Sequence, residues 1–179
     1  GSLVPDAIAM LEEPLRQRLH IRQQARPEQI DLLQKRYADL GVTAQLRTFF
    51  SDVPELLGNS HLVICRSGAS SVAELAAIGR PALLLPLPNA MDDHQRVNAL
   101  QMQDVGGGIC LDEKSVSAAA LATRLIQLLG APKTLAQMAK SARSLASPDA
   151  AKLIAALAEQ LVSLSTSKPT GPKPTGASA

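Results

Sequence analysis

Two groups of polar residues in the middle of the sequence have the chemistry to hold a ligand rich in hydroxyl groups. Glu74 follows a turn of small residues at positions 67–71, and Gln95 and Asn98 stand three positions apart at the start of a later helix. A carboxylate accepts hydrogen bonds from vicinal hydroxyls, whereas side-chain amides both donate and accept. Helix amino termini beside both groups would suit a diphosphate. Together the two groups favour a nucleotide sugar as the ligand.

The same turn has a purely structural interpretation. Ser71-Val72-Ala73-Glu74 fits a capping box, in which the serine hydroxyl accepts from the third helical amide and the glutamate reaches back to the cap amide. Gly68 and Ala69 could likewise serve only as turn residues. At this point Glu74 is open to both interpretations.

Charged residues near the two groups also allow more than one role. The guanidinium of Arg66 could neutralise a phosphate, or it could form a salt bridge to Asp52 or Glu74. The acidic pair Asp92-Asp93 is contiguous, which is typical of a helix start rather than of a divalent-metal motif. We therefore expect no metal site.

The elements that must position these residues alternate between strands and helices. Strands are predicted over residues 19–24, 44–50, 61–66, 81–87 and 109–111. Helices are predicted over residues 5–18, 27–40, 52–57, 71–78, 94–105, 117–129, 132–145 and 149–164. This alternation predicts an α/β fold with a parallel sheet covered on both faces and ligands at the carboxyl ends of its strands. The loop at positions 86–93 should then lie beside the turn at positions 67–71.

The domain should span residues 3–164 and be followed by a disordered tail. Residues 165–179 repeat Lys-Pro-Thr-Gly and lack apolar periodicity. The two cysteines, Cys65 and Cys110, lie in apolar runs without metal-ligand spacing, so we expect buried free thiols.

The composition predicts an aliphatic core and argues against nucleic acid as a partner. Hydrophobic residues make up 46% of the 179 residues but aromatic residues only 2%, so Leu, Ala, Val and Ile must build the core. A net charge of +2, with both signs interspersed, offers neither a basic surface for phosphates nor aromatic platforms for bases. No apolar run reaches the roughly 20 residues of a membrane span, and no signal peptide is recognised. We therefore expect a cytoplasmic protein.

Several motifs of the chain resemble one known family. They are Arg66-Ser67-Gly68-Ala69-Ser70-Ser71-Val72-Ala73-Glu74-Leu75, Gly79-Arg80-Pro81, Leu85-Pro86-Leu87-Pro88, Asp93-His94-Gln95-Arg96-Val97-Asn98-Ala99, Gln23-Gln24-Ala25-Arg26-Pro27 and Phe49-Phe50-Ser51-Asp52-Val53-Pro54. They look like the carboxy-terminal half of the MurG family. These peptidoglycan glycosyltransferases add N-acetylglucosamine to undecaprenyl-diphosphate-linked N-acetylmuramyl-pentapeptide, which converts lipid I to lipid II. The resemblance runs from Leu3 to Leu164.

The resemblance implies a two-domain GT-B fold whose Rossmann-like carboxy-terminal half holds UDP-N-acetylglucosamine, with no metal or other cofactor. It implies that the backbone of Phe50 meets the uracil and that Glu74 takes the ribose hydroxyls. It further implies that Gln95 holds the sugar hydroxyls, with His94 and Asn98 as neighbours. The loop and helix start around the nucleotide would be formed by Ala69, Ser70, Ser71, Val72 and Ala73.

Parts of the family pattern have no counterpart in the sequence. They are the amino-terminal domain, which binds lipid I and supplies the general base, and the strand and glycine-rich loop expected before the first helix. We therefore name no catalytic residue. In the doubly wound order 3-2-1-4-5-6 the strand without a counterpart is the central one. The strands that start at Leu19 and His61 should then lack the partner between them, and the chain alone should be marginally stable.

The expected function is the donor-binding part of an inverting glycosyltransferase. The 4-hydroxyl of the muramyl sugar would attack the anomeric carbon of UDP-N-acetylglucosamine as UDP leaves. The intact enzyme would associate peripherally with the cytoplasmic face of the inner membrane. Two other functions stay open: the donor domain of another GT-B transferase that uses a UDP- or TDP-sugar, and a non-catalytic module that binds a nucleotide or a protein partner.

Overall fold

The computed structural model describes residues 2–88, residues 93–146 and Glu159. The chain divides into two compact units, Gly1–Ala146 and Ser147–Ala179, and all the elements below belong to the first. The helix predicted over residues 149–164 and the tail predicted over residues 165–179 lie, apart from Glu159, outside the described residues.

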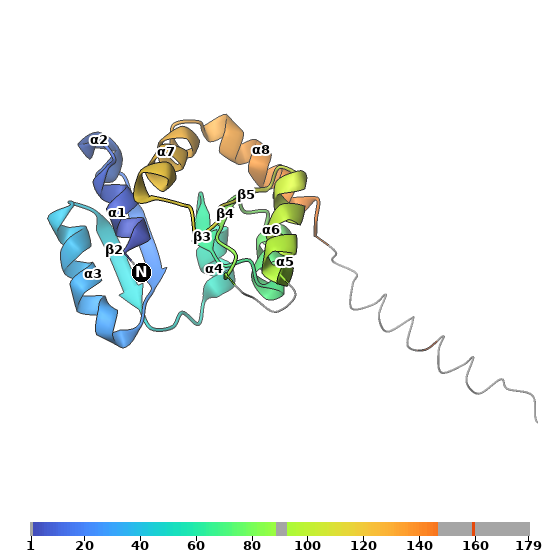
Figure 1. Cartoon of the computed structure of the whole chain (residues 1–179), viewed down its shortest axis with the longest axis horizontal. Coiled ribbons are helices and arrows are strands. Elements are labelled where there is room, and N and C mark those ends of the chain that lie inside the picture. Colours follow the sequence, from blue (N-terminus) through green and yellow to red (C-terminus); the bar gives the residue numbers. More distant parts are fainter. Residues whose placement is uncertain (1, 89–92, 147–158, 160–179) are drawn as a thin grey trace, which may run out of the picture. The chain divides into compact units, whose positions relative to one another are not determined.

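Helices and strands alternate along the first unit, as the sequence pattern predicts (Figure 1). The strands are β1 (His20–Gln24), β2 (Thr43–Arg47), β3 (Val63–Cys65), β4 (Ala82–Leu84) and β5 (Gly108–Cys110). The helices are α1 (Leu3–Ala9), α2 (Glu13–Arg16), α3 (Pro27–Asp39), α4 (Val53–Gly58), α5 (Ala69–Ile78), α6 (His94–Asp104), α7 (Ala118–Leu129) and α8 (Pro132–Arg143).

The strands form two parallel sheets with a break between β1 and β3. β1 pairs with β2, β3 with β4 and β4 with β5, each time in parallel. Within residues 2–88 no pairing joins β1 to β3. The prediction of a parallel α/β fold is therefore confirmed, as is the expectation that the strands near Leu19 and His61 lack a partner between them. In a sheet of order 3-2-1-4-5-6, the place of the first strand is at this break.

Burial differs across the three-stranded sheet in the way that this break predicts. All three residues of β4 are fully buried, with Leu83 on one face and Ala82 and Leu84 on the other. The residues of β3 are as apolar but only partly buried. A strand of a parallel sheet is covered when it has neighbours on both edges and helices on both faces. β3 has a paired neighbour on one edge, β4, and this accounts for its exposure.

The core consists of two aliphatic clusters, one on each face of β4. Leu83 belongs to the larger cluster, to which α1, α3 and α7 contribute; α1 and α7 lie side by side in Figure 1. Ala82 and Leu84 belong to the second cluster, with residues of α5 and α6. The buried aromatic side chains in the described residues are Tyr37 and Phe50. The predicted aliphatic core is thus confirmed.

One predicted helix is divided in two. The sequence pattern predicts a continuous helix over residues 5–18, but α1 ends at Ala9 and α2 begins at Glu13. Pro14 lies in the first turn of α2. Its ring has no N–H and would clash with the carbonyl of Met10, four residues earlier, if one helix ran through this segment.

Two glycines fix the ends of elements that bear on the site. Gly79 ends α5 in a left-handed conformation with φ of 72°, which a glycine adopts without strain. Gly107 precedes β5 where the chain passes close to α8, and a Cβ there would lie 2.6 Å from the Cα of Ala142. Only a glycine allows this approach of β5 to α8.

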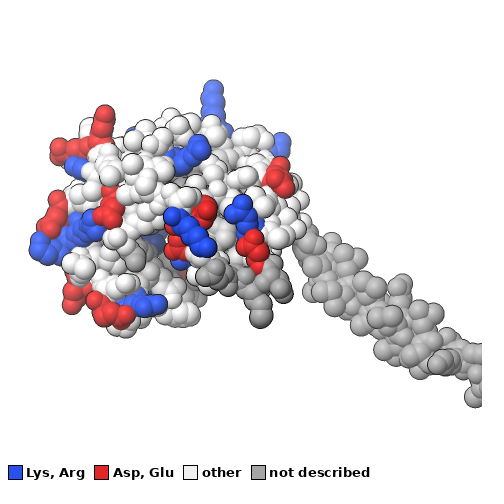
Figure 2. Space-filling view, viewed as in Figure 1, with Lys and Arg blue, Asp and Glu red and all other residues white. Residues whose placement is uncertain are grey.

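The surface carries charges of both signs. Figure 2 shows acidic and basic side chains interspersed on the visible face. No helix in the described part of the chain is long and apolar enough to cross a membrane. Among the same residues, no group of three or more His, Cys, Asp and Glu side chains could hold a metal ion.

Both cysteines are free thiols, as expected, but they are partly buried rather than buried. Cys65 and Cys110 both lie in register with Leu84, one strand away on either side. Two strand spacings amount to about 9.6 Å, which exceeds the Cα separation that a disulfide can bridge.

Candidate functional site

Three loops meet at the carboxyl edge of the three-stranded sheet. They follow β3 at Arg66, β4 at Leu85 and β5 at Leu111, and the strands that carry them are parallel neighbours. The carboxyl edge of such a sheet is where α/β proteins bind ligands. Most of the residues singled out in the sequence follow β3 or β4 at this edge.

The helix after the first loop begins earlier than the sequence predicts. α5 starts at Ala69 with Gly68 as its N-cap, and no side chain caps it. Ser71 therefore lies inside the helix, and the capping box predicted for Ser71 and Glu74 is wrong. Val72 N–H makes the first helical bond, to Gly68 O at 3.0 Å. The amides of Ala69, Ser70 and Ser71 point out of the amino terminus, where an anion can accept from them.

Ser67 fastens this loop to the start of α6. Its side chain is fully buried, and its Oγ donates to the backbone oxygen of Gln95 at 2.7 Å. Asn98 Nδ2 donates to the backbone oxygen of Ser67 at 3.0 Å. The predicted proximity of the two groups of polar residues is therefore confirmed. One side-chain N–H of Asn98 is therefore engaged in this junction.

The side chain of Gln95 is also engaged within the protein. Its Oε1 accepts from Leu87 N–H at 2.9 Å, so it links α6 to the loop after β4. The side-chain amide nitrogen has no partner among the described residues, and Gln95 is half-buried. That nitrogen can donate to a ligand while the oxygen holds the loop.

Glu74 is exposed on α5. Within residues 2–88 and 93–146 no hydrogen bond or ion pair engages its carboxylate. Its charge nevertheless acts on the sheet edge. Burial, and secondarily the charge of Glu74, raise the pKa of the Cys65 thiol to about 11. The carboxylate of Glu74 therefore has its acceptor sites available.

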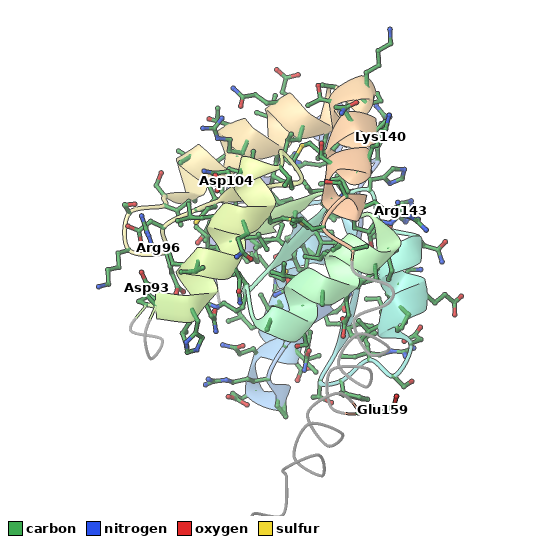
Figure 3. The ribbon with its side chains drawn as sticks, turned by 90° about the vertical axis from the view of Figure 1, so that its right-hand side faces the viewer. Asp93, Arg96, Asp104, Lys140, Arg143 and Glu159 are labelled. Carbon is green, nitrogen blue, oxygen red and sulfur yellow. The ribbon has the colours of Figure 1, made fainter. Side chains whose placement is uncertain are left out.

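The other predicted residues of these helices differ in exposure. Ala69, Ser70, Ala73 and His94 are exposed, whereas Ser71 and Val72 are half-buried. Figure 3 shows the amino-terminal end of α6, where Asp93 and Arg96 lie together, and Asp104 at its other end. Arg96 Nε lies 4.0 Å from a carboxylate oxygen of Asp93. Asp93 has φ of 53° and is the N-cap of α6, as expected for a helix start; Asp92 lies outside the described residues.

Arg66 makes neither of the salt bridges predicted for it. Its guanidinium forms a bidentate pair with Glu113, at 2.5 and 2.7 Å, and not with Asp52 or Glu74. Its Nη1 also donates to the backbone oxygens of Leu85 and Pro86. The hydrogen bond to Glu113 raises the pKa of Arg66, and the same bond lowers the pKa of Glu113. Sequence reasoning missed Glu113, because it lies 47 positions from Arg66.

Phe50 lies apart from these residues, after β2 in the other sheet. Its side chain is 7% exposed, and the guanidinium of Arg47 lies 5.6 Å from its ring centroid. The neighbouring Phe49 is 71% exposed. Within residues 2–88 and 93–146 no hydrogen bond joins either phenylalanine to α5 or α6. A planar base could therefore stack on Phe49, whereas Phe50 offers it only backbone atoms. Sequence reasoning missed Phe49, because adjacent identical residues give no indication of which one is buried.

Two hollows open at the carboxyl ends of the strands. One, of about 410 Å³, is lined by Pro86, Leu87, Pro88, Asp93, Arg96, Asp112 and Lys114. The other, of about 320 Å³, is lined by Gln24, Ala25, Arg26, Pro27, Gln29 and Thr48. The first carries two cationic and two anionic side chains, so its charge is balanced.

Known proteins are similar to this chain in both sequence and fold. The sequence model described as glycosyltransferase family 28 C-terminal domain matches residues 2–154. A relative from Rhodospirillum rubrum is 49% identical over 157 residues, which cover 88% of this chain and 41% of the relative. That relative is named UDP-N-acetylglucosamine--N-acetylmuramyl-(pentapeptide) pyrophosphoryl-undecaprenol N-acetylglucosamine transferase. The chain thus spans about two fifths of the length of the curated relatives it matches.

Solved structures agree with this match. MurG from Acinetobacter baumannii is 31% identical with a TM-score of 0.74, and the match covers 89% of this chain and 50% of that one. The glycosyltransferase VinC in complex with DTDP is 15% identical with a TM-score of 0.60, covering 93% of this chain and 38% of that one, and it shows the fold alone.

These matches confirm the resemblance to the MurG family and the GT-B type of fold that it implies. The family model covers most of the chain, from α1 to beyond α8. The chain therefore belongs to the family of glycosyltransferase family 28 C-terminal domains.

Proposed function

We propose that this chain is the donor-binding part of an inverting glycosyltransferase that moves N-acetylglucosamine from UDP-N-acetylglucosamine to the 4-hydroxyl of lipid I, giving lipid II. The relatives that share 43–49% of its sequence carry the name of this transferase. The observation that carries the proposal is the junction of Ser67 with Gln95 and Asn98 beside the exposed carboxylate of Glu74.

Each part of the donor meets a group suited to it. Glu74 accepts hydrogen bonds from the ribose hydroxyls, because its carboxylate is exposed and no capping bond engages it. The diphosphate meets the uncapped amides at the start of α5. Gln95 donates its amide to the sugar hydroxyls, with the exposed His94 beside it.

The uracil lies at the end of β2 in this proposal. The backbone of Phe50 meets its polar edge and the exposed ring of Phe49 is available to its face. Ala69, Ser70, Ser71, Val72 and Ala73 form the helix start around the nucleotide.

The transfer breaks the bond between the anomeric carbon and the diphosphate oxygen as the acceptor hydroxyl forms the new bond. The electron pair of the broken bond stays on UDP, so negative charge develops on the diphosphate. Amides at the start of α5 stabilise that charge, and prearranged donors of this kind commonly contribute several kcal/mol to catalysis, of the order of 3. We assign no general base and no acceptor site to this chain. The acceptor lipid I, and with it a peripheral position on the cytoplasmic face of the inner membrane, belong to the whole transferase.

Donor titrations test the proposal. Nuclear magnetic resonance or calorimetry should show that the chain binds UDP-N-acetylglucosamine more tightly than UDP-glucose or a TDP-sugar. Equal affinity for all of them would instead favour another GT-B transferase. Absence of binding to any nucleotide, in a chain that circular dichroism shows to be folded, would remove the proposal in favour of a module that binds some other partner.

A matched pair of variants tests the role of Glu74. Glu74→Ala should weaken donor binding at least about tenfold, because two hydrogen bonds to a charged acceptor are lost. Asp31→Ala removes another exposed helical carboxylate, on α3, and should leave the affinity unchanged. Equal affinities of the two variants would contradict the role assigned to Glu74.

A further inference from the structure

Arg66 joins the three loops at the carboxyl edge of the three-stranded sheet. It stands directly after β3, and its Nη1 donates to the oxygens of Leu85 at 3.2 Å and Pro86 at 3.4 Å in the loop after β4. Its two terminal nitrogens also bind both oxygens of Glu113, which lies in the loop after β5. A planar guanidinium that meets a carboxylate in this bidentate way is fixed in orientation as well as in position.

The peptide group between Pro86 and Leu87 is held from both sides. Arg66 donates to its carbonyl oxygen, and its N–H donates to Oε1 of Gln95 at 2.9 Å. The backbone of Gln95 is in turn held by Ser67, the residue next to Arg66 in the chain. These bonds form a closed ring that runs through Arg66, the Pro86–Leu87 peptide, Gln95 and Ser67.

Glu113 is not part of this ring, but its carboxylate fixes the guanidinium of Arg66, which is. Without its carboxylate, the guanidinium would keep only two long bonds to carbonyl oxygens, and nothing would set its plane. The loop that carries Glu113 has its own support, because Lys114 N–H donates to Asp112 Oδ1 and Val116 N–H to Asp112 O. These bonds hold the loop and so fix the position of the Glu113 carboxylate.

We propose that Arg66 and Glu113 form a positioning pair, which places the side chain of Gln95 for the sugar of the donor by holding the Pro86–Leu87 peptide. This inference rests on the proposed function. In this proposal Arg66 acts through the loop rather than as a phosphate ligand, because its Nη1 and one N–H of its Nη2 are engaged by Leu85, Pro86 and Glu113. Glu113 acts through Arg66.

The first measurement needs no ligand. Hydrogen exchange of the Leu87 amide should speed up about fivefold in Glu113→Gln and in Arg66→Gln, which corresponds to loss of one exposed charged pair. The double variant should be no faster than either single one, because the two residues act as a unit. Asp39→Asn is the control: it removes the exposed pair of Lys35 and Asp39, at 2.7 Å, and should leave the Leu87 amide as it is. Unchanged exchange in Glu113→Gln, or additive effects in the double variant, would overturn the positioning pair.

The second measurement separates the sugar from the nucleotide. Glu113→Gln should weaken UDP-N-acetylglucosamine binding about fivefold and leave UDP binding unchanged, since Gln95 faces the sugar. An equal loss for both ligands would mean that Arg66 serves the phosphates, and would overturn the inference while leaving the proposed function in place. If the unaltered chain binds neither ligand, the proposed function fails, and the assignment of the pair to donor positioning fails with it.

Discussion

The buried hydroxyl of Ser67 allows a quantitative test of how the two halves of the candidate site are joined. Ser67→Ala removes the bond from Oγ to Gln95 O, at 2.7 Å, from a fully buried position. The carbonyl of Gln95 remains in the first turn of α6, so the substitution leaves no acceptor without a hydrogen bond. The free energy of unfolding should fall by about 1 kcal/mol, the net value of a neutral hydrogen bond.

Asn98 provides the second side of a double-mutant cycle. Asn98→Ala removes the bond from Nδ2 to Ser67 O, at 3.0 Å, and should cost a similar amount. Both bonds join the same loop to the same helix. Once one bond is lost, the other joins a less rigid junction. The loss of unfolding free energy in the double variant should therefore be smaller than the sum of the two single losses by about 0.5 kcal/mol or more.

Urea unfolding followed by circular dichroism measures all four proteins, and donor titration shows whether the junction matters for binding. Ser60→Ala is the matched control. It also loses a 2.7 Å bond from a serine hydroxyl to a backbone oxygen, that of Leu56, but the bond is local to α4. This variant should lose comparable stability and keep the donor affinity. Strict additivity in the cycle, or equal donor affinity in Ser67→Ala and Ser60→Ala, would refute the view that Ser67 positions α6.

Four further outcomes are expected. Gly107→Ala should cost about 2–3 kcal/mol in urea unfolding, because its Cβ meets the backbone of α8, whereas Gly58→Ala, with nothing within 4 Å, should cost none. Because the pKa of Glu113 is lowered in the folded protein, its ion pair stabilises the fold at pH values above the ordinary carboxyl range. This contribution is lost as the pH falls through the lowered pKa. In Glu113→Gln the free energy of unfolding should therefore depend less on pH on the acid side. The pKa of Cys65, about 11, should fall in Glu74→Ala, and its alkylation at alkaline pH should speed up; an unchanged rate would place Glu74 elsewhere. The chain alone should be marginally stable because of the break between β1 and β3. A single sharp thermal unfolding transition, in a chain that retains its native parallel sheet, would contradict this.

The order of the elements could be predicted from the sequence because each one is marked locally. Pro27 begins α3 and Gly79 ends α5, and short apolar runs mark the strands between them. The break in the sheet followed from the resemblance to the MurG family, in which a strand precedes the first helix, because the doubly wound order places that strand between the two that begin near His20 and Val63. The proximity of the Ser67 and Gln95 loops followed from topology, because parallel strands end at one edge.

The partner of Arg66 could not be predicted, and the reason is physical. A salt bridge depends on where two loops meet in space, and sequence spacing carries that information only within a helix or across a hairpin. Asp52 and Glu74 are nearer in sequence, but Glu113 follows the second strand along the sheet, on the same edge as Arg66. Register across the sheet, rather than distance along the chain, decides the pair.

The helix start that sequence reasoning misplaced also decides what Glu74 can do. A capping box needs the serine at the N-cap, but Gly68 has the extended backbone of that position, with ψ of 153°, and places Ser71 inside the helix. Ser67 precedes the N-cap, and its Oγ, which donates to Gln95 O, accepts from no amide of α5. The amides at the start of α5 are thus left without a side-chain cap, and Glu74 is left with an exposed carboxylate. The start of α5 at Gly68 is therefore the reason that this helix can offer both free amides and a carboxylate to a ligand.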